Sequence, residues 1–193
     1  MPGPPTTTIT VVLVCHNDVE MFKRKVEEIL CWTRQPDELR IYSSFPFPKH
    51  RGIGTIVDPD CDDKGYRKTR RGMLTATKDW VVRVNYDDLH SWDFLKELEA
   101  ATRPDSTVVH CEMAGKYAIG GIDGKKFVPY SSGAENFMVR TSIAKQLDPF
   151  ADTKGYGAGN TSHPPDADFI NAIRAEVHLD TIEYVPKVLV VVL

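Results

Sequence analysis

The sequence predicts one α/β domain in which helices flank a mainly parallel central sheet. A length of 193 residues, of which 41% are hydrophobic and 26% charged, suits a single globular unit. Continuous runs of β-branched apolar residues, such as Ile9–Cys15, are typical of strands that are covered on both faces. These runs alternate with segments of helical periodicity. Strands that alternate with helices form right-handed βαβ units, and therefore a mainly parallel sheet.

The first half of the chain shows this alternation most clearly. Ile9–Cys15 is predicted to be a central parallel strand, and the helix after it ends at Pro36, because proline does not continue a helix. Further strands are predicted over residues 39–44, 55–57 and 80–84, and further helices over residues 66–79 and 92–101.

The second half is predicted to be less regular. Strands are expected over residues 107–111, 135–139, 181–185 and 188–193, a hairpin over residues 117–130, and helices over residues 142–147 and from Asp166 onward. Residues 155–165 are rich in glycine and proline and too long for a plain connection. Such a segment is a lid or a binding loop, or else it is disordered.

Composition and charge argue against several classes of function. The net charge is −3 and the pI about 6.1, so there is no global basic field that would make nucleic acid or anionic lipid the main partner. No segment approaches the roughly 20 apolar residues of a membrane span, and the first eight residues do not form a signal peptide. The abrupt apolar run at residues 188–193 would fit one domain of a longer polypeptide.

The cysteines bear on the cellular compartment. Cys15, Cys31, Cys61 and Cys111 are scattered along the chain without any CxxC spacing. Cys15 and Cys111 fall within predicted strands. We therefore expect reduced and mostly buried cysteines in a cytoplasmic protein.

Two adjacent carboxylates, Asp87 and Asp88, follow the strand predicted over residues 80–84. In open α/β sheets, ligands bind at the carboxyl ends of the strands. Paired carboxylates beside a phosphate-bearing ligand are the usual way to hold Mg²⁺ or Mn²⁺. The alternative is that both residues only form a turn and favour the N-terminus of the next helix.

A cluster of basic residues stands out in this otherwise acidic protein. Its members, which lie in or just before the helix predicted over residues 66–79, are Lys64, Arg67, Lys68, Arg70 and Arg71. One interpretation is a solvated helix face. The other is that Arg67 lies near the mouth of the sheet and binds a diphosphate, because a guanidinium forms paired hydrogen bonds with phosphate oxygens.

Three histidines and a second acidic pair lie in or beside predicted loops. His16 and His90 follow two strands and His163 lies in the glycine-rich segment, but their spacing matches no zinc motif. Asp166 and Asp168 begin a helix, where they either complement its dipole or supply a general base. Side chains two residues apart on a helix point about 200° from each other, so only one of the two can face a cleft.

The order of four of these features resembles the family 2 glycosyltransferases of the GT-A fold. They are the apolar strand ending in Cys-His-Asn, the Asp-Lys-Gly-Tyr-Arg turn at residues 63–67, the Asn-Tyr-Asp-Asp motif at 85–88 and the Pro-Asp-Ala-Asp motif at 165–168. The resemblance implies one GT-A (Rossmann-like) domain over residues 1–193. Residues 9–103 would form its nucleotide-sugar-binding half and residues 104–193 its acceptor-binding half.

The activity that this resemblance implies is the metal-dependent, inverting transfer of a sugar from a nucleotide diphosphate sugar, with UDP as the expected nucleotide, to an acceptor hydroxyl. In the DxD-like motif, Asp87 and Asp88 would bind Mn²⁺ or Mg²⁺, and His163 is a third candidate ligand. Asp166 would be the catalytic base. The residues implied to bind the nucleotide sugar are His16, Asn17, Ser43, Ser44, Asp63, Arg67, Asn85 and Tyr86.

The chain departs from the family pattern at four places. Asn85 replaces the first acid of the metal motif, His16 a tyrosine, Ser43-Ser44 a pair of aspartates and Pro165 a glutamate. A non-catalytic module that binds sugar nucleotides or glycans therefore stays an alternative. A sugar-phosphate nucleotidyltransferase shares the sheet topology but needs a glycine-rich loop after the first strand, and residues 15–19 contain no glycine.

Overall fold

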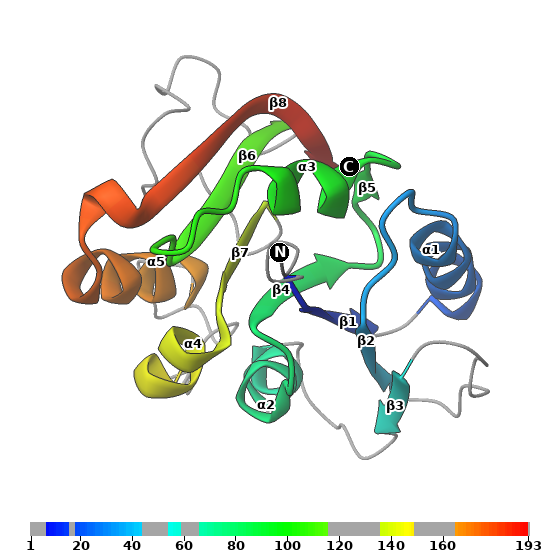
Figure 1. The fold of residues 1–193 in the computed structure, drawn as a ribbon. Helices are drawn as coiled ribbons and strands as arrows, with labels where there is room; N and C mark the ends of the chain where they lie inside the picture. Colours follow the sequence, from blue (N-terminus) through cyan, green and yellow to red (C-terminus); the bar gives the residue numbers. More distant parts are fainter. Residues whose placement is uncertain are drawn as a thin grey trace, which may run out of the picture.

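A single eight-stranded sheet organises the part of the chain that the computed structural model describes, which is residues 7–15, 18–43, 54–58, 66–115, 136–148 and 165–192. The strand order is β3-β2-β1-β4-β7-β6-β8-β5 (Figure 1). The strands are β1 Ile9–Cys15, β2 Glu38–Ser43, β3 Gly54–Asp58, β4 Trp80–Asn85, β5 Leu89–His90, β6 Val108–Gly115, β7 Phe137–Arg140 and β8 Ile182–Val192. The helices are α1 Val19–Leu30, α2 Tyr66–Thr75, α3 Phe94–Ala100, α4 Thr141–Leu147 and α5 Pro165–Glu176, with a 3-10 turn at Leu179–Thr181.

Parallel pairing brings the ends of four strands to one edge of the sheet. Strand β1 runs parallel to β2 and β4, and β2 runs parallel to β3. In this register Cys15 pairs with Ser43 and Val14 with Asn85, so strands β1, β2 and β4 end level with one another. We call this edge the carboxyl edge and the opposite one the amino edge. The predicted α/β class with a mainly parallel sheet is confirmed.

The other half of the sheet mixes directions. Strand β7 is antiparallel to both β4 and β6, whereas β8 is parallel to β6 and antiparallel to the short strand β5. Because β7 reverses direction between β4 and β6, strand β6 again ends at the carboxyl edge. The antiparallel strand β7 thus separates the parallel strands β1–β4 from β6 and β8, whereas β5, from the first half of the chain, pairs at the far edge with β8.

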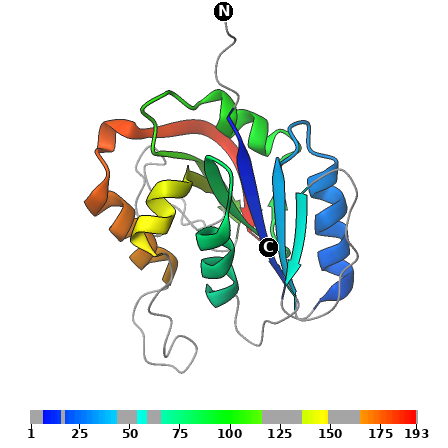
Figure 2. The same cartoon turned by 60° about the horizontal axis from the view of Figure 1, so that its bottom comes forward.

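Alternate residues of the central strands pack against different helices. Val11 and Leu13 of β1 belong to the core that α1 and α3 cover, whereas Val12 and Val14 belong to the core that α2, α4 and α5 cover. Figures 1 and 2 show these two groups of helices on opposite faces of the sheet. Side chains alternate along a strand, and both faces are buried here. This is why almost every residue of β1 is apolar.

Helix α2 lies very close to the sheet at Gly72. A Cβ atom added there would come within 2.4 Å of Val12 Cγ1 and 3.0 Å of Tyr42 Cε2. Both neighbours are buried, and the branched Val12 side chain has little freedom to move. The absence of a side chain at Gly72 thus sets the distance between α2 and strands β1 and β2.

Gly72→Ala is expected to lower the melting temperature. Alanine at an ordinary helix position would add about 1 kcal/mol of helix propensity. Here the overpacking should outweigh that gain and leave a net loss of about 1–2 kcal/mol, or about 2–8 °C. Thermal unfolding followed by circular dichroism measures the change, and a higher melting temperature would refute the close approach.

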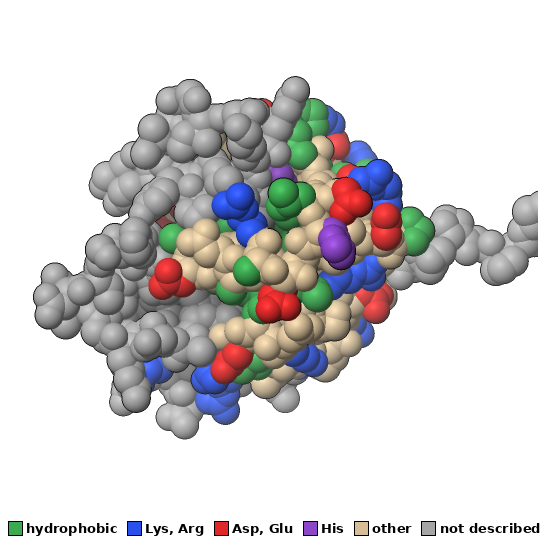
Figure 3. Space-filling view, turned by 90° about the vertical axis from the view of Figure 1, so that its left-hand side faces the viewer, with side chains coloured by type: hydrophobic (Ala, Val, Ile, Leu, Met, Phe, Trp, Pro, Cys, Tyr) green, Lys and Arg blue, Asp and Glu red, His purple; other side chains and the backbone are tan. Residues whose placement is uncertain are grey.

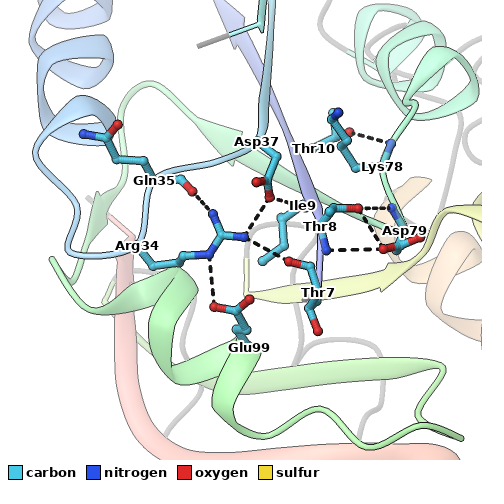
Figure 4. A network of polar contacts seen from close by, with 10 residues as sticks. All are labelled: Thr7, Thr8, Ile9, Thr10, Arg34, Gln35, Asp37, Lys78, Asp79 and Glu99. Carbon is cyan, nitrogen blue, oxygen red and sulfur yellow. Dashed lines mark hydrogen bonds and ion pairs between the residues drawn. The ribbon is translucent and has the colours of Figure 1, made fainter. Parts of the chain in front are cut away.

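Side-chain contacts hold the amino edge together, as Figure 4 shows. Arg34, in the loop between α1 and β2, binds Asp37 at 2.7 Å and Glu99 of α3 at 3.0 Å. The Thr8 hydroxyl donates to Asp79 Oδ2 at 2.7 Å, and the Asp79 backbone N–H donates to Thr8 Oγ1 at 3.1 Å. These contacts tie the segments that precede β1, β2 and β4 to one another and to α3.

Strand β8 is continuous, although the sequence predicts two strands. It includes Pro186, which has no N–H to donate. Its pairing with β6 shifts register on both sides of Glu112, between Cys111 and Glu112 and between Glu112 and Met113. Such bulges take up extra residues without ending a strand, so the prediction of two strands is wrong.

The helix predicted over residues 66–79 ends earlier, at Thr75. The Thr77 N–H donates to Glu38 Oε2 at 3.0 Å, and the Lys78 N–H donates to Thr10 Oγ1 at 3.4 Å. Side chains of β1 and β2 thus accept from backbone groups that would otherwise continue the helix. The helix propensity of residues 76–79 does not reveal these tertiary contacts.

Two described cysteines differ in their exposure. Cys111 is buried in β6 and Cys31 is exposed at the C-cap of α1, and both are free thiols. Burial raises the pKa of the Cys111 thiol, which disfavours the thiolate. Of the two cysteines described, Cys111 is thus buried as expected, whereas Cys31 is exposed.

The described surface carries charges of both signs. On the face over α4 and α5, acidic and basic side chains are interspersed (Figure 3). Among the described helices, none combines the length and the apolar composition that crossing a membrane requires.

Candidate functional site

The acidic turn, residues 85–88, follows β4 at the carboxyl edge. Asn85 is the last residue of the strand, and its Nδ2 donates to Asp88 Oδ2 at 3.1 Å. Asp88 is only 4% exposed, whereas Asp87 is exposed. Within the described residues we find no hydrogen bond or ion pair to the Asp87 carboxylate. Of the two carboxylates in this turn that are predicted to bind a metal, Asp87 is the one that a bound ligand can reach directly.

The alternative role of this pair, a turn that also favours the start of the next helix, fits the structure only in its first part. After the turn comes the two-residue strand β5, and α3 begins only at Phe94 with Asp93 as its N-cap. Asp87 and Asp88 therefore lie too far along the chain to complement the dipole of this helix, which acts within the first turn. The alternative holds only in part, because Asp88 does help to form the turn.

An ion pair between the buried Lys25 and the half-buried Glu28 on α1 contacts the backbone at the end of the acidic turn. Lys25 is 3% exposed, and its Nζ contacts Glu28 Oε2 at 2.7 Å and the backbone carbonyl of Asp88. Glu28 Oε1 accepts from the His90 N–H at 3.3 Å. Burial lowers the pKa of Lys25, and the neighbouring carboxylate of Glu28 opposes this effect.

Sequence analysis missed Lys25, although the chain carries a signal for it. Phe22, Val26 and Ile29 are the buried apolar residues of α1. Lys25 lies three residues after Phe22 and four before Ile29, which places it on the same helix face. A lysine inside an apolar stripe is the pattern that could have indicated a buried, paired ammonium.

The basic cluster on α2 has three different environments. Arg67 is exposed one residue after the helix begins, close to the carboxyl edge. Lys68 is 2% exposed, so the interpretation of a solvated face is wrong for it. Arg70 forms a two-pronged ion pair with Asp148 at 2.7 Å for each contact. Among the described members, Arg67 lies closest to the start of α2 and so to the carboxyl edge, and its contact with a diphosphate stays a prediction.

Helix α5 begins at the carboxyl edge. Asp166 is its second residue, and Phe169, one turn further, has its ring 6.0 Å from that of Phe137, the first residue of β7. Ile170 and Ile173 are fully buried, whereas Asp168 is exposed. The helix therefore packs through one face and leaves Asp168 on the other. The side chain of Asp166 lies outside the described part of the structure.

A second polar group lies where β6 pairs with β8. The ring of His110, which is 1% exposed, lies 5.2 Å from that of Tyr184. The Tyr184 hydroxyl donates to the carboxylate of Glu112. Burial lowers the pKa of His110 to about 4, because an imidazolium loses its hydration there.

The buried His110 predicts how stability depends on pH. Its pKa is about 4 in the folded protein against 6.5 in the unfolded chain, so below pH 6.5 the unfolded chain binds more protons. The contribution of His110 to the free energy of unfolding therefore keeps its full value above pH 6.5. Between pH 6.5 and 4 this contribution falls by up to about 1.4 kcal/mol per pH unit. His110→Phe should make the unfolding free energy less dependent on pH in this window.

Chemical denaturation at several pH values tests this prediction. His178→Gln changes an exposed histidine and is the matched control, for which the wild-type slope is expected. An unchanged slope in His110→Phe would refute a neutral, buried imidazole.

Of the remaining predicted site residues, the structure describes two, Ser43 and Tyr86. Ser43 is fully buried at the end of β2, and Tyr86 is half-buried against the core under α1 and α3. His16, Asn17, Ser44, Asp63 and His163 lie outside the described residues, as do the predicted hairpin at 117–130 and most of the glycine-rich segment at 155–165.

The carboxylates at the edge suit only one kind of metal site. In the described ranges, no three His, Cys, Asp or Glu side chains come together that could hold a metal ion. The acidic turn itself offers two carboxylates, Asp87 and Asp88. Hard oxygen ligands in this number fit Mg²⁺ or Mn²⁺ when phosphate oxygens and water complete the coordination, and they do not fit a closed zinc site.

Comparison with known proteins gives no match by sequence and several by structure. No protein-family model and no curated protein sequence matches the chain. The structure of S. aureus TarS 1–349 has a TM-score of 0.69 at 12% identity and covers 96% of this chain and 60% of its own. The mannosyltransferase PcManGT from Pyrobaculum calidifontis, in complex with GDP-Man and Mn²⁺, has a TM-score of 0.64 at 16% identity. The match covers 99% of this chain and 58% of the mannosyltransferase chain.

A third match is glucosyl-3-phosphoglycerate synthase from Mycobacterium tuberculosis, in complex with Mn²⁺, UDP and glucosyl-3-phosphoglycerate. Its TM-score is 0.61 at 14% identity, covering 95% of this chain and 71% of its own. The chain thus has the fold of the GT-A glycosyltransferases, and this prediction is confirmed. The chain spans 60% of the TarS fragment and 36% of the longer TarS structure.

Proposed function

We propose that the protein is a glycosyltransferase that moves a sugar from a nucleoside diphosphate sugar, with UDP as the nucleotide, to an acceptor hydroxyl. The observation that carries this proposal is the exposed Asp87 carboxylate, which a fixed turn presents at the carboxyl edge of a GT-A sheet. Ligands bind at this edge in open α/β sheets. In support, solved structures with this fold contain UDP-GlcNAc, GDP-Man with Mn²⁺, or UDP with Mn²⁺.

The donor half, residues 9–103, would stabilise the departing diphosphate. Asp87, with Asp88 behind it, would hold Mn²⁺ or Mg²⁺ against the diphosphate, and the ion would supply positive charge to the leaving group. Arg67 would donate paired hydrogen bonds to the same phosphates. Asn85 uses its Nδ2 to bind Asp88, so its Oδ1 is the atom that we assign to a ribose hydroxyl.

The acceptor half, residues 104–193, would supply the base. The acceptor oxygen forms a bond to the anomeric carbon while the bond from that carbon to the diphosphate oxygen breaks. The nucleoside diphosphate leaves with the bonding electrons, and the hydroxyl proton passes to the Asp166 carboxylate. Attack from the face opposite the leaving group inverts the anomeric configuration. The start of α5 at the carboxyl edge supports this assignment.

A non-catalytic module that binds sugar nucleotides is the second candidate. It is favoured by the burial of Asp88 and by Asn85, which contributes no charge, so that only one exposed carboxylate belongs to the acidic turn. Such a module would bind the donor and leave it intact. Donor turnover therefore separates the two candidates.

Ligand-induced thermal shift is the experiment that tests the proposal. UDP- and GDP-sugars are screened with MnCl₂ and with EDTA, because a ligand that binds only the folded state stabilises it by RT ln(1 + [L]/Kd). We expect a UDP-sugar to raise the melting temperature in MnCl₂ and not in EDTA. Equal shifts in both would refute the metal assignment, and no shift with any nucleotide sugar would refute the proposed function.

A further inference from the structure

The buried Lys25 and the half-buried Glu28 make contacts on both sides of Leu89. The Lys25 Nζ donates to the backbone carbonyl of Asp88, and Glu28 Oε1 accepts from the backbone N–H of His90. Between themselves the two side chains form an ion pair at 2.7 Å. One i,i+3 pair on α1 thus binds both the end of the acidic turn and the last residue of β5.

Aromatic packing and a side-chain hydrogen bond restrict the same segment further. The His90 ring lies 4.9 Å from Phe94 and 5.8 Å from Trp32, and its Nδ1 lies 3.4 Å from Lys25 Nζ. At the other end, Asn85 binds the Asp88 carboxylate. The chain from residue 85 to residue 90 is therefore fixed on both sides of Asp87, whose own side chain is exposed.

Stability alone does not account for a lysine at this position. An ammonium loses most of its hydration on burial, and a buried ion pair is often no more stabilising than well-packed apolar residues of similar volume. An apolar residue would also match Phe22, Val26 and Ile29, which bury the same helix face. What an apolar residue could not do is donate a hydrogen bond to the Asp88 carbonyl.

We propose that Lys25 is a positioning residue, which together with Glu28 holds the backbone of Asp88–His90 so that the Asp87 carboxylate stays in place to bind a divalent cation and a diphosphate. This inference rests on the proposed function. Groups that orient a metal ligand typically contribute 10–100-fold to metal affinity. A positive charge near a cation site acts in the opposite direction, because it repels the incoming ion. The sign of the change in affinity therefore separates positioning from simple repulsion.

The test is Mn²⁺ binding to Lys25→Met in the presence of UDP. Free Mn²⁺ is measured by electron paramagnetic resonance at a temperature at which circular dichroism shows that every variant is folded. We expect the Kd for Mn²⁺ to rise about 10–100-fold. Lys23→Met is the matched control, because Lys23 forms the same i,i+3 contact with Glu20 at 2.7 Å on the same helix but is 50% exposed. Its Kd should match the wild type within twofold. Unchanged or tighter Mn²⁺ binding by Lys25→Met would overturn the inference.

Two further measurements keep the inference falsifiable if Lys25→Met is poorly folded. Lys25→Arg keeps a buried donor and a charge, and should bind Mn²⁺ more tightly than Lys25→Met. Glu28→Gln removes one of the two carboxylate oxygens, and should show an intermediate loss. A wild-type Kd in Glu28→Gln would contradict the role of the pair.

Hydrogen exchange of the free protein separates this inference from the proposed function. Loss of the Lys25 contacts should speed exchange in residues 86–91, relative to the wild type and to Lys23→Met, with no added metal or nucleotide. If the wild type bound neither Mn²⁺ nor UDP, the proposed function would fail, and this measurement would still show whether Lys25 holds the turn. Unchanged exchange in residues 86–91 would overturn the inference on its own.

Discussion

Asp87→Asn is expected to weaken Mn²⁺-dependent binding of UDP by about 100-fold or more, while the melting temperature stays near that of the wild type. Asp87 is the exposed carboxylate of the acidic turn, and it makes no hydrogen bond or ion pair with another described residue. Removing an exposed charge of this kind changes stability by about 0.5 kcal/mol or less. Losing a direct metal ligand should cost more than the 10–100-fold that is typical of residues that only orient one.

Isothermal titration of UDP in MnCl₂ measures this effect. Asp105→Asn is the control, since Asp105 is also exposed but lies in the loop before β6, at the amino edge. Its affinity for UDP should equal that of the wild type. If Asp87→Asn bound UDP as tightly as the wild type in MnCl₂, Asp87 would not be a metal ligand.

Asp166→Asn is expected to lower kcat about 10²–10⁴-fold while the protein still binds the donor and Mn²⁺. A general base contributes about this much to proton transfer, and an amide cannot accept the proton of the acceptor hydroxyl. Asp166 lies at the start of α5, one turn before Phe169, which packs against the beginning of β7 at the carboxyl edge.

Asp168→Asn is the matched comparison, because it removes the neighbouring carboxylate in the first turn of the same helix. Asp168 is exposed on the face away from Phe169 and Ile170, and its loss should cost at most about 1 kcal/mol of helix-dipole stabilisation. If turnover fell in Asp168→Asn instead, the role of base would pass to Asp168. Near-normal turnover in both variants, or a product that keeps the anomeric configuration of the donor by NMR, would exclude the mechanism with a single carboxylate base.

The sequence was most informative where local pattern and tertiary environment agree. Most residues of strands β1 and β4 are apolar because both faces of the sheet are covered, and this burial produces the pattern. The two-residue strand β5 is too short to show any periodicity, and it exists only because Leu89 and His90 pair with β8. Two strands were predicted where β8 is continuous, because the bulge at residues 186 and 187 depends on the partner strand β6 and is not visible in local sequence.

At the candidate site, the sequence located the acidic residues but did not show which of them is exposed to a ligand. Adjacent aspartates after a strand indicate a ligand-binding edge, yet only the folded turn shows that Asp88 points inward and Asp87 outward. Lys25 was missed because lysine is rarely fully buried, and its pairing with Glu28 looks like an ordinary surface pair on a helix. Distinguishing it from Lys23 depends on contacts with Asp88 and His90, more than sixty residues away.

The most direct test of the central claim is the release of UDP from the UDP-sugar that stabilises the protein. The release is measured in MnCl₂ and in EDTA, with water or an added hydroxyl compound as the acceptor. We expect wild-type protein to release UDP in MnCl₂, and Asp87→Asn and the EDTA sample to match a blank without protein. Intact donor after prolonged incubation with wild-type protein that binds both Mn²⁺ and the donor would contradict a glycosyltransferase and leave a binding module in its place.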